Sequence, residues 1–127
     1  MNPQAPAVLA ELAGLMIRNS DPDVPEAERT SDLSLSAAIL GVAAEIWDRQ
    51  AHILVEENRA LRSLLDVSGD DADLHLSALT RSNGQLRAAL IVAHIAAEAA
   101  GDTARQDAIW AELAASTERR RLSTAPV

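Results

Sequence analysis

A heptad repeat in the middle of this chain constrains its fold more than any other feature of the sequence. Between residues 33 and 65, apolar side chains recur at alternating spacings of four and three residues, which places them on one stripe of an α-helix. One line of this stripe is Leu33, Leu40, Trp47, Leu54 and Leu61, and the other is Ala37, Ala44, Ala51, Asn58 and Leu65. An amide such as that of Asn58 at a seam position fixes helix register or partner choice at a cost in stability.

Three further helices are predicted around this one. A heptad pattern after the Ser-Gly-Asp-Asp segment predicts a long helix over about residues 71–100, and Gly101 is expected to end it. Shorter helices are predicted over about residues 6–18 and 103–121, and residues 123–127 are expected to form a loose tail. Because the connection between the long helices is short, we expect an all-α fold. In it a long antiparallel hairpin over residues 32–100 and two shorter helices form a four-helix bundle, as a single domain spanning residues 1–127.

Composition excludes several classes of chemistry. The 19 acidic and 11 basic residues give a net charge of −8, which disfavours nucleic acid as a partner. The basic residues are all Arg, so Lys-dependent chemistry is excluded, and the lack of Cys excludes thiol catalysis and Cys-based metal sites. No signal peptide and no membrane span are recognised, because Glu11, His94 and Glu98 interrupt the most apolar stretches. We therefore expect a soluble cytoplasmic protein without a cofactor.

The unequal helix lengths predict an uncovered end of the long hairpin. The shorter helices are expected to cover only one end, and exposed apolar surface at the other end would mark an interface. We therefore expect a homodimer whose hairpin tips pack together. The expected interface residues are Leu54, Asn58, Leu61, Leu65, Leu76, Leu79, Asn83 and Leu86. The alternative is a monomer, in which the two short helices stack end to end and cover the hairpin.

Few residues suggest chemistry. A di-metal bundle requires Glu-x-x-His on two helices, and none of the three histidines has Glu three positions before it. His94 and Glu98 share a helical face within an apolar stretch, so with Arg87 they are a candidate polar site or a solvated polar stripe.

Two charged groups have similar alternatives. His75, which follows Asp71 and Asp73, suggests a weak metal site or exposed first-turn residues. The three consecutive arginines at residues 119–121 suggest a phosphate or acidic-partner site, or charges that stabilise a helix C-terminus.

A family resemblance covers about the middle half of the chain. It rests on the segment from Glu57 to Leu65, a Gly-Asp turn, and the Leu-Ser-Ala-Leu and Leu-Arg-Ala-Ala-Leu segments that follow. In these segments the chain resembles small uncharacterised helical bacterial proteins encoded beside acyl-CoA dehydrogenases and aminoglycoside-phosphotransferase-like kinases. The resemblance implies an accessory role and carries no catalytic motif.

The sequence leaves two hypotheses of function. The first is a non-catalytic helical bundle that self-associates and acts as an accessory or protein-interaction subunit. The alternative is a small-molecule-binding protein or minor enzyme with a polar site around His94 and Glu98.

Overall fold

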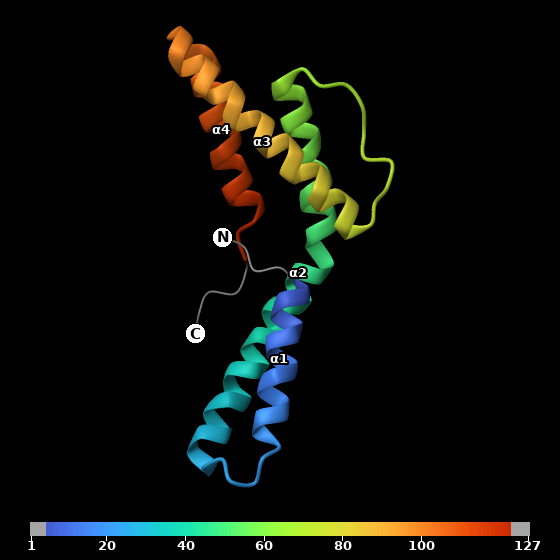
Figure 1. Ribbon diagram of the computed structural model, residues 1–127, viewed down its shortest axis with the longest axis vertical. Helices are drawn as coiled ribbons and strands as arrows, with labels where there is room; N and C mark the ends of the chain where they lie inside the picture. Colours follow the sequence, from blue (N-terminus) through green and yellow to red (C-terminus); the bar gives the residue numbers. More distant parts are fainter. Residues whose placement is uncertain (1–4, 123–127) are drawn as a thin grey trace. The chain divides into compact units, whose positions relative to one another are not determined.

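The computed structural model describes the backbone of residues 5–122 as four helices (Figure 1). They are α1 (Ala5–Asn19), α2 (Glu26–Leu65), α3 (Leu76–Ala100) and α4 (Thr103–Arg119). The predicted all-α class is confirmed, and no strand occurs in the described residues. None of the described helices is long and apolar enough to cross a membrane. The predicted loose tail at residues 123–127 lies outside the described part of the chain.

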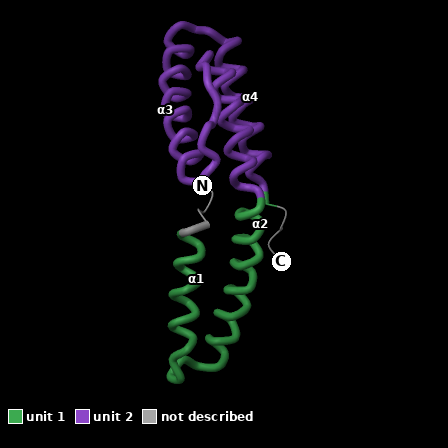
Figure 2. The backbone as a smooth tube through the Cα atoms, turned by 90° about the vertical axis from the view of Figure 1, so that its right-hand side faces the viewer, with its two compact units in different colours: residues 1–48, 122–127 green, residues 49–121 purple. Residues whose placement is uncertain are grey.

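The chain forms two compact units, and α2 contributes to both (Figure 2). The first comprises Met1–Asp48 and Leu122–Val127, and we refer to it as the hairpin unit. The second, Arg49–Arg121, is the three-helix unit. Each unit has its own buried side chains and is described separately.

In the hairpin unit, α1 runs antiparallel to residues 26–48 of α2 (Figures 1 and 2). The helix α2 begins at Glu26, six residues before the predicted start of the long hairpin at residue 32, and Glu26 and Glu28 place negative charge at the positive end of its dipole. The side chain of Arg29 reaches back and donates to the carbonyl oxygens of Asp21 and Val24, at 3.0 and 3.2 Å. These bonds fix the connection between the two helices.

Each of the two helices in this unit buries a single line of side chains against the other. Leu12 and Leu15 of α1 are buried, as are Ser36, Ala43 and Ile46 of α2. On α2 this buried line lies one residue away from the predicted seam. The helix α1 therefore packs on a face rotated by about 100° from the heptad stripe.

The three-helix unit has a conventional aliphatic core. Residues 49–65 of α2 pack with α3 and α4 around a cluster of Leu61, Leu86, Leu90 and Ile109. Each of the three helices contributes to this cluster, as expected for a small helical bundle.

The connection between α2 and α3 differs from the predicted short turn. Asp66, at a positive φ of 56°, ends α2, and the amide of Val67 donates to the Arg62 carbonyl at 2.9 Å, which closes the helix end. Residues 66–75 are not helical, and Asp71 within them bonds back to Arg62 and Asn58 of α2. The connection therefore returns alongside α2, and α3 then rises in the same general direction as α2 (Figures 1 and 2).

The antiparallel pair of the three-helix unit is instead α3 and α4. Gly101, at a φ of 65°, ends α3 as predicted, because this left-handed conformation is accessible to glycine without strain. Asp102 then caps α4 by accepting the amide of Arg105 at 3.0 Å.

Candidate functional site

The predicted interface residues are largely buried within the chain itself. Leu54, Asn58, Leu61, Leu79, Asn83 and Leu86 are each at most 8 % exposed, and Leu65 and Leu76 are half-buried. The expectation that this end of the long helices is uncovered is therefore wrong. The reason is that α3 and α4 both pack on this part of α2.

A buried carboxylate lies at the centre of the three-helix unit. Glu57 of α2 is 1 % exposed, and its carboxylate accepts hydrogen bonds from Arg87 of α3, from Ser116 of α4 and from Arg120, which follows α4 directly. The Nε of Arg120 lies 3.0 Å from Oε2 of Glu57, and Arg87 also donates to the Ser116 hydroxyl at 2.7 Å. One carboxylate thus joins all three helices.

These contacts keep Glu57 ionised. Burial acts to raise its pKa, but the hydrogen bonds from Arg120, Ser116 and Arg87 outweigh burial and hold the pKa of the Glu57 carboxyl below its ordinary value. A carboxylate that is ionised and fully hydrogen-bonded is a poor general acid or base at neutral pH. The arrangement therefore serves to hold the helices together.

A pair of amides extends this polar network. Asn83 donates to Oδ1 of Asn58 at 3.0 Å, and Asn58 donates to the Leu79 carbonyl at 3.3 Å and to Asp71 at 3.0 Å. Arg120 also lies 3.3 Å from Oδ1 of Asn83, so the amide pair and the Glu57 cluster are continuous. Asn58 and Asn83, both expected at the interface between copies, thus bond to each other within one chain.

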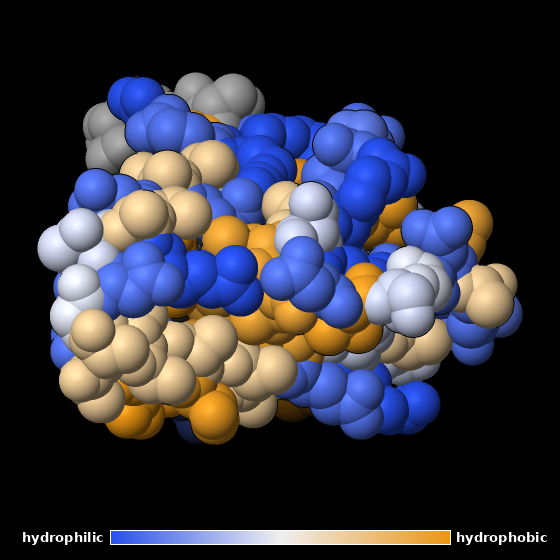
Figure 3. All heavy atoms as spheres, turned by 90° about the horizontal axis from the view of Figure 1, so that it is seen from above, coloured by the Kyte–Doolittle hydropathy of each residue, from blue (hydrophilic) through white to orange (hydrophobic). Residues whose placement is uncertain are grey.

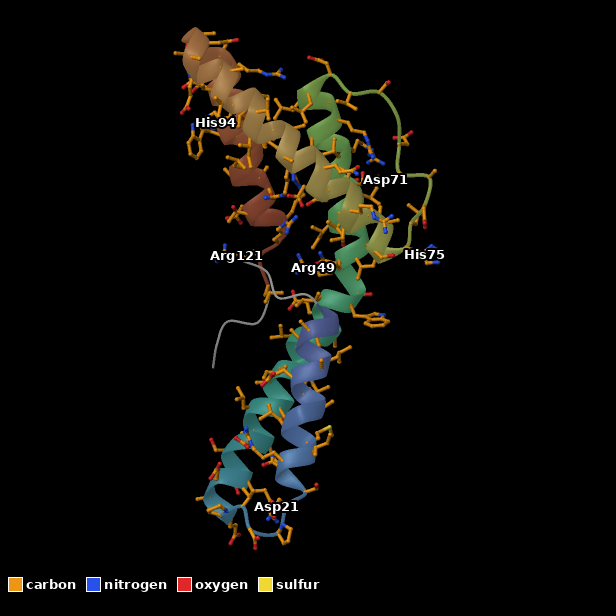
Figure 4. The ribbon with its side chains drawn as sticks, viewed as in Figure 1. Asp21, Arg49, Asp71, His75, His94 and Arg121 are labelled. Atoms are coloured by element: carbon orange, nitrogen blue, oxygen red, sulfur yellow. The ribbon has the colours of Figure 1, made fainter. Side chains whose placement is uncertain are left out.

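Asp71 anchors the connection at residues 66–75 to this network. Its carboxylate accepts from Arg62 at 2.7 Å, and Arg62 also donates to Ser82 of α3 at 2.9 Å. The hydrogen bond from Arg62 lowers the pKa of the Asp71 carboxyl. Figure 4 shows Asp71 on the side of the connection that faces the helices, whereas His75 points away from them.

The structure does not bring Arg87, His94 and Glu98 together as one polar site. Arg87 is engaged with Glu57 and Ser116, so it does not join the other two residues. His94 lies 3.8 Å from the Glu98 carboxylate, and its ring meets the ring of Trp110 edge-on at 5.5 Å. His94 therefore packs between α3 and α4 as part of their contact.

The remaining charged candidates are also separated. The imidazole of His75 lies 2.5 Å from the Asp73 carboxylate, while Asp71 faces α2. No group of three or more His, Asp or Glu side chains in the described part of the chain is arranged to hold a metal ion. The three consecutive arginines contact three different carboxylates, Glu112, Glu57 and Glu118, so they do not form one phosphate site.

The most prominent surface feature lies on the hairpin unit. The first half of the predicted seam is uncovered: Leu33, Leu40 and Trp47 are 57 %, 48 % and 74 % exposed, and Ala37 and Ala44 between them are also exposed. On α1, Leu9 and Met16 are exposed, with Ala13 between them. Both stripes lie one residue after the buried line of their own helix.

Simple geometry places the two stripes on the same side of the hairpin. A step of one residue rotates the side chain by about 100° around a right-handed helix. Because the two helices are antiparallel, the same step turns both stripes toward one side of the plane that contains the helix axes. We call the resulting surface the hairpin face; it comprises Leu9, Ala13, Met16, Leu33, Ala37, Leu40, Ala44 and Trp47.

The hairpin face carries no charged residue, whereas the opposite side of the same hairpin carries Glu11, Arg18 and Glu45. This asymmetry distinguishes the face from ordinary surface, on which apolar side chains are scattered singly. No protein-family model matches this sequence, and searches of curated proteins and of solved structures return no match.

Proposed function

We propose that this chain is a non-catalytic, self-associating helical protein, in which the hairpin face binds the same face of a second copy. It would act as an accessory or protein-interaction subunit, and the cysteine-free sequence supports a cytoplasmic location. The observation that carries the proposal is the uncharged apolar face formed by two antiparallel helices, which is uncovered in the described chain.

The fold of the hairpin unit supports a second helical layer. Two helices bury only the row between them, and stable helical folds cover an apolar face with another layer. Two hairpins stacked face to face form a four-helix bundle in which Leu33, Leu40 and Trp47 lie inside. The small side chains of Ala37 and Ala44 leave space between them for the large side chains of the facing helices.

The distribution of charge favours a second copy of this chain as the partner that covers the hairpin face. An apolar face that meets a copy of itself around a two-fold axis places no carboxylate or guanidinium in the contact. The opposite side of the hairpin is charged, so a third copy has no equivalent surface to occupy. The contact through the hairpin face therefore joins two copies and does not extend to a third.

The experiment compares two leucines on the same helix. Leu40 lies on the hairpin face and is 48 % exposed, whereas Leu35 lies on the opposite side and is 52 % exposed. Leu40→Glu and Leu35→Glu add the same charge to the same helix at positions of similar exposure. Sedimentation velocity over a range of concentrations measures the mass of each variant and of the wild type.

We expect Leu40→Glu to lower the average mass at concentrations where the wild type and Leu35→Glu are associated. Burying the exposed half of Leu40 in both copies contributes about 2 kcal/mol, so its loss alone weakens association about 30-fold. A wild type that stays monomeric at all concentrations, or a Leu40→Glu variant with the mass of Leu35→Glu, would overturn the proposal.

A further inference from the structure

A second uncovered apolar surface lies on α3 in the three-helix unit. Ile91, Val92 and Ile95 are 62 %, 68 % and 60 % exposed. Gly84, Ala88 and Ala99 are exposed and lie on the same side of the helix, opposite the buried residues Leu86, Leu90 and Ala97. We call these six exposed residues the α3 face. Figure 3 views the molecule from the end at which α3 meets α4 and shows uncovered apolar spheres there.

The α3 face is complementary to itself when reversed. Consider an antiparallel copy of α3 centred between Ile91 and Val92. Ile91 then lies opposite Val92, Ala88 opposite Ile95, and Gly84 opposite Ala99. On each side of the central pair, the large side chain of Ile95 meets the small side chain of Ala88. Farther out, Gly84 and Ala99 are both small, so the two helices can approach closely.

The charges at the two ends of α3 fit the same arrangement. Arg81 is exposed near the N-terminal end, whereas Glu98 is exposed near the C-terminal end. In the antiparallel register Arg81 lies within one helical turn of the position opposite Glu98. In a parallel pairing Arg81 would face Arg81, and Glu98 would face Glu98, so both ends would repel.

We infer that α3 pairs antiparallel with α3 of a second copy, through the α3 face and with the two-fold axis near residues 91 and 92. Each half of the pair supplies the same residues to the other, as an interface around a two-fold axis requires. This inference rests on α3 alone, and it adds a second contact between copies to the one proposed for the hairpin face.

Disulfide cross-linking tests the register, because the natural chain contains no Cys. Two single variants of the full chain, Ala88→Cys and Ile95→Cys, are mixed and oxidised. The antiparallel register brings residue 88 of one copy opposite residue 95 of the other, within disulfide range. Two copies of residue 88 instead lie about 10 Å apart along the helix axis, because seven residues separate positions 88 and 95.

We expect the mixed disulfide between residues 88 and 95 to exceed both symmetric products by at least about tenfold. Ala89→Cys mixed with Ile95→Cys is the control, because Ala89 is exposed on the same helix but lies off the α3 face. Yields equal to this control would overturn the inference, and a predominance of the symmetric products would show parallel pairing and overturn the proposed register.

The same pair of variants in a Leu40→Glu background separates the two proposals. The mixed disulfide should persist there, since the α3 face does not include the hairpin face. Its loss in that background would overturn independent pairing of α3. Its persistence together with an unchanged mass for Leu40→Glu would leave the α3 contact supported and the hairpin contact refuted.

Discussion

The buried carboxylate of Glu57 provides the sharpest test of how the three-helix unit is held together. Glu57→Gln preserves the size of the side chain but removes its charge, and the new amide group directs hydrogens at guanidiniums that can only donate. Arg87 and Arg120 then lose the carboxylate that neutralises them. Removing one partner of a buried ion pair costs about 3–5 kcal/mol, and because the side chains of Arg87 and Arg120 are 39 % and 21 % exposed, we expect a loss near the lower end of this range.

This loss is a large fraction of the stability of a domain of this size, which is about 5–15 kcal/mol in total. For 60–100 residues, each kcal/mol lowers the melting temperature by about 4–8 °C, so Glu57→Gln is expected to lower it by at least about 12 °C. Urea unfolding followed by the fluorescence of Trp110 measures the effect in this unit, provided that both proteins carry Trp47→Phe.

Glu56→Gln is the matched control for this experiment. Glu56 is the neighbouring residue, and its carboxylate accepts from the exposed side chain of Arg59 at 2.6 Å, one turn away. Pairs of this kind contribute about 0.3–0.5 kcal/mol. The proposed role of the buried carboxylate is refuted if the free energies of unfolding of Glu57→Gln and Glu56→Gln differ by less than about 1 kcal/mol.

The same carboxylate makes stability depend on pH with a defined sign. The pKa values of Glu57 and Asp71 are lowered in the folded state, so their contribution to the free energy of unfolding is complete above their unfolded pKa values of about 4.3 and 3.9. It is lost as the pH falls through the lower folded values. The wild type should therefore lose stability below about pH 4, and Glu57→Gln should lose less over the same range.

Four further substitutions test individual contacts and backbone positions. Asn58→Ala removes the bonds of a fully buried amide and should cost about 1–3 kcal/mol in urea unfolding; a neutral effect would contradict the network. Asp71→Asn should release residues 66–75 from Arg62, which limited proteolysis detects as faster cleavage there with unchanged helix content, whereas cleavage at the wild-type rate would argue against the anchor. Gly101→Ala should destabilise by about 1–2 kcal/mol, because Gly101 is left-handed, whereas Gly84→Ala within α3 should stabilise by about 1 kcal/mol. Thermal melts that show the same sign for both glycine variants would refute this reasoning.

The periodicity of the sequence predicts the helices well but not the face that each helix uses. Along residues 36–46 of α2, two neighbouring lines are apolar: Leu40 and Ala44 lie on one, and Ala43 and Ile46 on the other. Either line can accept α1, and the structure shows that α1 covers the second. The periodicity of α2 does not predict which of the two lines is covered, because that depends on how a separate helix packs.

The polar network was missed for a related reason. Glu57 looks like an ordinary surface residue of a charged helix, and the residue that neutralises it, Arg120, lies 63 positions later. One signal was present: Asn58 and Asn83 on the predicted seams indicated a buried polar contact, and the structure joins them. The direction of α3 could not be predicted either, because it depends on Asp71 bonding back to α2.

The long separation between Glu57 and Arg120 also affects how the chain is made. At a synthesis rate of about 5–20 residues per second, the 63 positions between them take about 3 to 13 s to add. During that interval α2 and α3 can meet, but the carboxylate has only the Arg87 guanidinium to neutralise it, and the Ser116 hydroxyl does not yet exist. The last turn of α4 therefore decides when this unit becomes stable, and nascent chains that stop short of it should be recognised by chaperones as unfinished.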